Sequence, residues 1–205
     1  MERTLDLRSG EYRFEPADWR SDAGQVLGNV GSGSEDGEPM WHLHDVVRAD
    51  GRTVLEVLDD RRGMAGMLDT TGQQFLFRRP GGEPVMAYEH EGGLTAKGAT
   101  LRAAGTDERL GSWEKTGRFF GDWELTDRDG RHVATASREW SLSDLFYPVF
   151  AMTSSAGHDI GALDLAQSGL FYSAAVTLSP SEIQPELHLA FAYGIFRAYA
   201  IRRET

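Results

Sequence analysis

Cysteine is absent from this sequence of 205 residues. Without a thiol, the chain cannot form disulfides, thiolate zinc sites, cysteine nucleophiles or palmitoylated anchors. Proline is also scarce, with 7 residues against 24 glycines. Because glycine tolerates the backbone conformations of tight turns, this balance favours many short strands joined by hairpins.

Positive charge is in deficit. The chain has 21 basic and 32 acidic residues, which gives a formal net charge of -11. The average field of such a molecule repels a nucleic-acid backbone and an anionic membrane surface. We therefore expect no nucleic-acid partner and no membrane association, and instead a protein or small-molecule partner of unknown identity.

Long hydrophobic runs are missing as well. The most apolar stretch, residues 187–201, includes His188 and Arg197 and is shorter than the roughly 20 apolar residues of a spanning helix. The N-terminal sequence MERTLDLRSG lacks the basic and then apolar pattern of a signal peptide, so the expected location is cytoplasmic. No shift in composition separates a second unit, and residues 1–205 are expected to form a single domain.

One short pattern occurs three times. Each copy has an apolar residue five positions before a glycine, a polar residue three before it and an apolar residue three after it, around Gly51, Gly72 and Gly130. This is the pattern of a strand, a tight turn and a returning strand. Other antiparallel proteins contain such hairpins too. Further strands are predicted at residues 12–14, 74–78, 85–89, 146–152 and 170–178.

The C-terminal segment predicts a helix over about residues 184–203. Cap residues, prolines and acidic residues precede it, and Arg202 and Arg203 follow, as is typical of helix ends. Apolar residues occupy nearly every side of its helical wheel, so other parts of the chain must surround it. The expected core positions of this helix are Leu187, Phe191, Gly194, Ile195, Phe196 and Arg197.

Two of these positions carry a more specific expectation. Gly194 is expected where a strand or a bulky side chain approaches the helix closely. An unpaired guanidinium is costly to bury. Arg197 is therefore expected either to pair with a carboxylate from a strand or to lie at an open end of the surrounding structure, with its guanidinium in water.

These features resemble the tubby-like fold, in its phospholipid scramblase and LURP-one-related branch. The resemblance rests on the hairpins WELTDRDGRHVATASRE and GMLDTTGQQFLFRR and on the tail SEIQPELHLAFAYGIFRAYAIRRE. It implies a mainly β fold, a closed antiparallel barrel of about 12 strands around a buried hydrophobic C-terminal helix. The chain departs from scramblases because it has no cysteine and only one carboxylate in the segment SAAVTLSPSEIQ. Lipid scrambling is therefore not expected.

His42 and His44 are the most ligand-like residues. Positions i and i+2 on a regular strand face the same side, so the two rings could bind one metal ion. Cupin barrels add a glutamate four or five residues later, where this chain has Arg48 and Ala49. The two histidines are thus weak metal candidates, and two strand histidines that face solvent or the rim explain the pattern better.

Other candidate sites have simpler explanations. Gly28, Gly31 and Gly33 suggest a phosphate loop, but acidic residues follow them and a flexible loop explains them better. His158 with Asp159 and Asp164 could form an acid–base group, although solvated loop charges are the simpler reading.

Three functions follow from the sequence. The leading hypothesis is a non-catalytic interaction or ligand-binding domain of the tubby-like type, with no catalytic residue and no cofactor. The first alternative is a small β-barrel enzyme or metal-binding barrel that uses His42 and His44. The second alternative, which rests on the family resemblance alone, is a peripheral phospholipid-binding protein.

Overall fold

A computed structural model gives the fold of the chain. It describes residues 7–17, 30–31, 40–59, 74–91, 98–106, 108–116, 122–139, 148–168 and 171–204. These residues contain thirteen strands and one helix: β1 (Gly10–Pro16), β2 (Val30–Gly31), β3 (Met40–Arg48), β4 (Thr53–Asp59), β5 (Gln74–Arg78), β6 (Pro84–Glu91), β7 (Gly98–Ala103), β8 (Arg109–Lys115), β9 (Trp123–Asp127), β10 (His132–Arg138), β11 (Val149–Ser154), β12 (Asp159–Ser168), β13 (Phe171–Leu178) and α2 (Pro185–Glu204).

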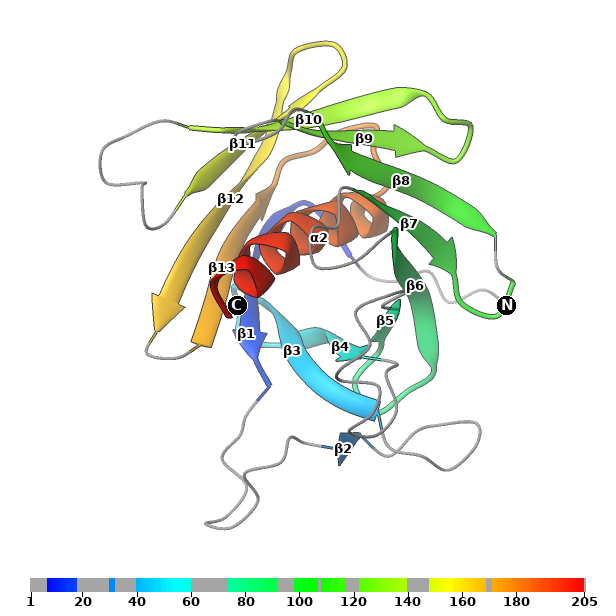
Figure 1. Cartoon of the computed structure of the whole chain (residues 1–205), viewed down its shortest axis with the longest axis vertical. Coiled ribbons are helices and arrows are strands. Elements are labelled where there is room, and N and C mark those ends of the chain that lie inside the picture. The colour runs from blue at the N-terminus through cyan, green and yellow to red at the C-terminus, as the bar shows by residue number, and fades with distance from the viewer. Residues whose placement is uncertain are drawn as a thin grey trace.

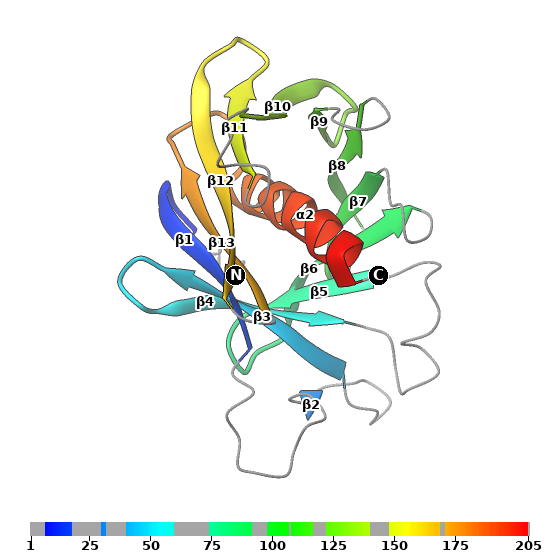
Figure 2. The ribbon, with the colours of Figure 1, turned by 60° about the vertical axis from the view of Figure 1, so that its left-hand side comes forward.

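The strands form a closed antiparallel barrel. From β3 to β13 each strand pairs with the next one in the chain, and β1 closes the ring by pairing with both β13 and β3. The short β2 pairs only with the start of β3, so twelve of the thirteen strands form the ring. Figures 1 and 2 show this ring around α2. The prediction of a mainly β fold, with a closed antiparallel barrel of about 12 strands and a C-terminal helix, is confirmed.

The hairpins follow the glycine pattern of the sequence. The turns between β3 and β4 and between β9 and β10 hold Gly51 and Gly130 at φ 83° and 77°, values that favour glycine. After the second turn, Ala134 pairs with Leu125 and Ala136 with Trp123, and all four side chains are buried. The turn of the third copy, at Gly72, lies outside the described residues.

The individually predicted strands agree with the structure, some with wider bounds. Residues 74–78 coincide with β5, and residues 12–14 and 85–89 lie within β1 and β6. The segments 146–152 and 170–178 overlap β11 and β13, which begin at Val149 and Phe171. Strands β2, β7, β8 and β12 were not predicted. The sequences of the three longer ones, GATLRA, RLGSWEK and DIGALDLAQS, contain many glycine, alanine and charged residues, which have weak β-propensity.

Helix α2 fills the barrel. It spans Pro185–Glu204, in agreement with the predicted helix, and its non-glycine residues from 187 to 197 are only 0–8% exposed. Phe191 contacts Trp113 of β8, and Phe196 contacts Phe14 of β1. The core therefore lies between the inner faces of the strands and all sides of α2. In the described part of the chain, no helix is long and apolar enough to cross a membrane.

Candidate functional site

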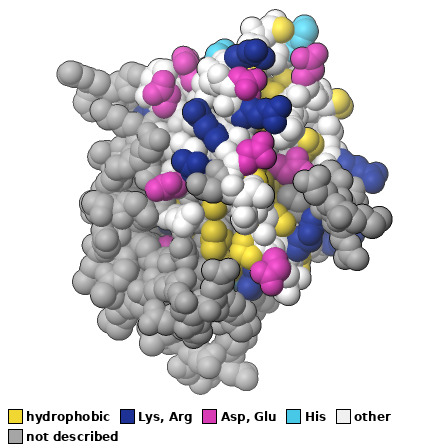
Figure 3. Space-filling view, turned by 90° about the vertical axis from the view of Figure 1, so that its right-hand side faces the viewer, with side chains coloured by type: hydrophobic (Ala, Val, Ile, Leu, Met, Phe, Trp, Pro, Cys, Tyr) yellow, Lys and Arg dark blue, Asp and Glu magenta, His cyan; other side chains and the backbone are white. Residues whose placement is uncertain are grey.

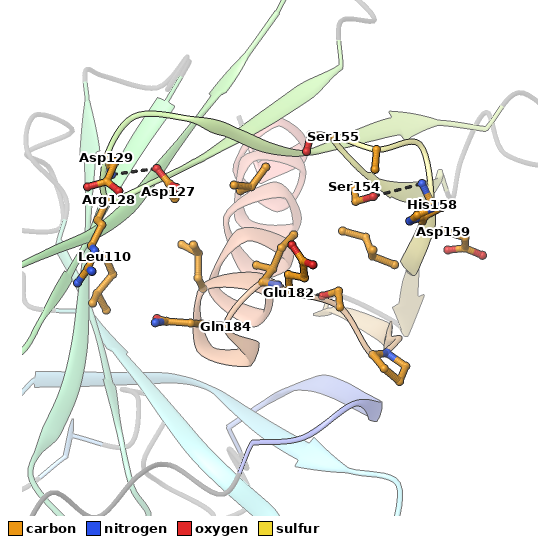
Figure 4. Close-up of a pocket in the computed structure, with 17 residues that line it drawn as sticks. Leu110, Asp127, Arg128, Asp129, Ser154, Ser155, His158, Asp159, Glu182 and Gln184 are labelled. Atoms are coloured by element: carbon orange, nitrogen blue, oxygen red, sulfur yellow. Dashed lines mark hydrogen bonds between the residues drawn. The ribbon is translucent and has the colours of Figure 1, made fainter.

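An open cleft lies at the barrel mouth where α2 begins. Its walls are the turn between β9 and β10, the turn between β11 and β12, and residues 180–184, which precede α2. Its volume is about 810 Å³, and Figure 4 shows the lining side chains around the first turns of the helix.

The base of the cleft is apolar. Ile160 and Leu187 are buried in the hydrophobic core, and the half-buried Leu110, Val133 and Ile183 pack against that core. The base is therefore continuous with the interior of the barrel. An apolar surface that is already packed from below needs little ordering when a ligand binds.

The packing under the base depends on a glycine. A Cβ atom built on Gly111 of β8 would lie 2.6 Å from Cδ1 of Leu187 and 2.6 Å from the carbonyl oxygen of Thr126. Because Gly111 has no side chain, Leu187 can pack directly on the backbone of β8. Gly111 thus sets the depth of the cleft base.

The rim of the cleft is mostly acidic. Its charged side chains are four carboxylates and one guanidinium, namely Asp127, Asp129, Asp159, Glu182 and Arg128, and His158 also lies on it. Most of them come from the hairpin turns and the segment before the helix, so they are close together only in the folded barrel. The rim carries an excess of negative charge, in keeping with the acidic chain as a whole.

Two rim carboxylates are held by the backbone. Oδ1 of Asp127 accepts hydrogen bonds from the N–H groups of Asp129 and Arg131, both at 2.9 Å. Oδ1 of Asp159 accepts one from the N–H of Gly161, also at 2.9 Å. These bonds fix the two carboxylates in place and leave Oδ2 of each without a hydrogen bond from any described residue.

Part of the rim charge is neutralised by neighbours outside the cleft. Nη1 of Arg128 lies 3.5 Å from Oε1 of Glu108, and Oδ2 of Asp129 lies 3.6 Å from Nη1 of Arg131. By contrast, no described cation forms an ion pair with Asp127, Asp159 or Glu182. We call these three residues the acidic triad of the cleft.

A second polar group lies inside the barrel. Nδ1 of His44 is 3.0 Å from the hydroxyl oxygen of Tyr193 on α2, and the His44 ring packs on Phe196 with centroids 5.0 Å apart. Burial lowers the pKa of His44 well below its ordinary value, and the charge of Arg197 and then His42 lower it further. Burial also raises the pKa of Tyr193 and Tyr88.

Arg197 does not form the ion pair that was the first of its two expected environments. The residue is only 8% exposed, and its guanidinium carbon lies 5.3 Å from the centroid of the Phe75 ring. This is a cation–π contact in place of the expected ion pair, since no described carboxylate forms a salt bridge with Arg197. Its Nε atom is buried and has no hydrogen-bond partner among the described residues.

The expected shared face of His42 and His44 is not found. A β-bulge between them puts His42 in register with Leu58 and His44 with Val57, adjacent residues on β4. Adjacent strand residues face opposite sides. Accordingly, His44 points inward to Tyr193, whereas Nε2 of His42 lies 3.1 Å from Oδ1 of Asp45. Within the described ranges, no three side chains of metal-binding type come together.

The proposed acid–base group is divided by the fold. His158 and Asp159 line the cleft, but Asp164 is exposed on β12, where it pairs with Val149 and Ala175. The glycine-rich segment 28–37 lies outside the described residues, apart from Val30 and Gly31. The sequence did not predict the cleft, because its lining comes from separate hairpins and no local motif marks it.

Comparisons with known proteins assign no family. No protein-family model, no curated protein and no solved structure matches this chain. The functional argument therefore rests on the residues of the cleft and of the barrel interior.

Proposed function

We propose that this chain is a non-catalytic binding domain of the tubby-like type, and that its ligand binds in the mouth cleft. The observation that carries the proposal is the combination of a fixed apolar base with a polar rim in one cavity of about 810 Å³. This volume falls within the roughly 300–1,000 Å³ of typical ligand sites, which also combine apolar walls with a few fixed polar groups.

The filled interior supports a site at the mouth. Side chains of α2 occupy the space enclosed by the strands, and Phe191, Tyr193 and Phe196 are almost completely buried there. A ligand could enter the barrel only by displacing the helix from its core. The cleft is reached without any such change.

The arrangement of polar groups favours binding over catalysis. An enzymatic nucleophile needs a neighbouring base that accepts its proton. Oγ of Ser154 instead accepts a hydrogen bond from the backbone N–H of His158, and Oγ of Ser181 accepts one from Ile183. Among the residues described around the cleft, no hydrogen bond joins the His158 ring to a serine or a carboxylate. These hydroxyls stabilise the loops that form the walls.

A fragment screen by NMR tests this proposal. We expect small apolar fragments to shift the methyl signals of Leu110, Val133 and Ile183. Ala156, an exposed residue of the β11–β12 turn, lines the cleft, so Ala156→Trp should fill it and abolish these shifts. The matched control is Ala166→Trp, at an exposed position on β12, which should leave them unchanged. Fragment shifts that survive in Ala156→Trp would place the binding site elsewhere.

A further inference from the structure

We infer that the natural ligand of the cleft is a short peptide segment of another protein, with aliphatic residues at its centre and a lysine or arginine on each side. The aliphatic side chains contact the apolar base, and the cations contact the acidic triad. This inference rests on the proposed binding function and adds the chemical class of the ligand.

The base selects for an aliphatic group. Leu110, Val133, Ile160, Ile183 and Leu187 supply only hydrocarbon side chains to it. Covering such a surface is favourable in proportion to the apolar area removed from water. A ligand without an apolar part would leave the base hydrated and would gain nothing from it.

The position of the acidic triad selects for more than one positive charge. Figure 4 shows Asp127 and Asp159 on opposite walls, with Glu182 between them and with the carboxylate of Asp159 on the outer side of its wall. A small amine with one charge can approach only one wall closely. A peptide with basic residues on both sides of an aliphatic centre places one long cationic side chain near Asp127 and lets the other extend over the opposite wall to Asp159. The Oδ2 atoms of these two residues, which accept no hydrogen bond from the described residues, can accept bonds from the cations.

An anionic ligand is disfavoured, although the N-terminus of α2 lies at this mouth. A helix N-terminus alone attracts negative charge. Here the first turn of α2 carries Glu186, and Glu182 precedes the helix. Together with Asp127 and Asp159, these side chains oppose the field of the helix end and favour a cation. The net charge of -11 also steers positively charged partners toward the molecule.

The test uses three capped hexapeptides that differ only in charge. Each has two central leucines flanked by serines, and its two end residues are lysines, glutamines or glutamates. Binding to the full chain is measured by calorimetry, and the site is located by NMR. We expect the lysine peptide to bind roughly ten-fold more tightly than the glutamine peptide, as two partly exposed ion pairs allow. The glutamate peptide should bind most weakly, and added salt should reduce these differences.

Neutral variants of two triad residues, Glu182 and Asp159, test the role of their carboxylates. Glu182→Gln and Asp159→Asn should each weaken binding of the lysine peptide about two- to five-fold without changing that of the glutamine peptide. The amide oxygen of Asp159→Asn can still accept the bond from Gly161, so the β12 backbone should be retained. The control Asp164→Asn removes the same charge from β12, outside the cleft, and should have no effect.

The outcomes separate this inference from the proposed function. Equal binding of the lysine and glutamine peptides, abolished for both by Ala156→Trp, would overturn the charge preference and leave the cleft as the binding site. Tight binding of hexylamine with no binding of the lysine peptide would overturn the peptide class. If peptides and fragments all fail to shift the signals of the cleft, both proposals are wrong.

Discussion

His188 of α2 is a buried histidine without a polar partner at Nε2 among the described residues. Its exposure is 1%, and burial lowers its pKa from 6.5 to about 4. The neutral ring is therefore the form that the folded barrel accommodates. His44 behaves in the same way, because its pKa is also lowered, by burial first and then by Arg197 and His42.

Stability should fall at mildly acidic pH. Between pH 6.5 and 4 the unfolded chain binds a proton at His188 that the folded chain does not bind, so the free energy of unfolding decreases as the pH decreases. The loss attributable to His188 should reach about 3 kcal/mol at pH 4, with a further loss from His44. Urea unfolding measured at several pH values checks this expectation.

The matched variants are His188→Leu and His132→Gln. The leucine cannot be protonated, so His188→Leu should flatten part of the pH dependence without loss of stability at pH 7. His132 is exposed on β10, and its replacement should leave the pH dependence unchanged. If the free energy of unfolding of His188→Leu depends on pH as steeply as that of the original protein, His188 is not the source of the pH dependence.

Gly194 permits close contact between α2 and β8. A Cβ atom at this position would lie 2.4 Å from Nε1 of Trp113, and Trp113 is itself held between Tyr88 and Phe191, with ring centroids at 5.4 and 6.2 Å. In an unobstructed helix, glycine to alanine stabilises by about 1 kcal/mol. Here we expect Gly194→Ala to destabilise, and Gly194→Leu to destabilise further, by 1–3 kcal/mol or more.

Chemical unfolding of Gly194→Ala shows directly whether the substitution raises or lowers the free energy of unfolding. The control Ala198→Gly removes a methyl group from a half-buried position one turn later and should destabilise by helix propensity, by about 1 kcal/mol. If Gly194→Ala proves more stable than the original protein, Trp113 does not lie close enough to Gly194 to exclude a methyl group.

Helix α2 as a whole fills the interior of the barrel with its side chains. Phe196 lies against His44 and Phe14, with centroids 5.0 and 5.5 Å away, and against Tyr193 of the same helix. Truncation of this side chain in Phe196→Ala should cost about 3–5 kcal/mol, measured by denaturant unfolding. Thr177→Ala, on the exposed side of β13, should change stability by less than about 0.5 kcal/mol. Equal effects of the two substitutions would show that α2 is not packed as described.

Deletion of residues 187–205 tests the helix as a unit. The inner side chains of the strands, among them Phe75, Tyr88 and Trp113, would lose the surface that buries them. We expect an insoluble product, or one that binds hydrophobic dyes and lacks a cooperative melting transition. A truncated protein that stays monomeric and melts as sharply as the full chain would show that the helix is peripheral to folding.

At the scale of the whole molecule, charge opposes anionic surfaces. The net charge is -11, and on the face seen in Figure 3 basic and acidic side chains alternate and do not gather into one basic patch. Vesicles that contain phosphoinositides should therefore not retain the protein at physiological salt. Sedimentation with such vesicles, and with neutral vesicles as the control, measures this. Saturable retention that depends on the headgroup would favour the phospholipid-binding alternative instead.

Local sequence patterns were enough to predict several parts of the fold. The apolar residues on every side of residues 187–197 required a surrounded helix, because no soluble surface helix lacks a polar face. Gly51 and Gly130 required turns because their neighbours form alternating strands. The absence of cysteine ruled out thiol chemistry. Each of these conclusions concerns residues that are close together in the chain.

Features that depend on distant residues or on irregular strand pairing became visible only in the folded barrel. The bulge at β3 separates His42 from His44, and alternation along a sequence cannot reveal such a bulge because it depends on the register with β4. Phe75 stabilises Arg197 from a strand more than a hundred positions away. The cleft exists because closure of the barrel brings Asp127, Asp159 and Glu182 to one mouth, an arrangement set by strand order and not by any local sequence pattern.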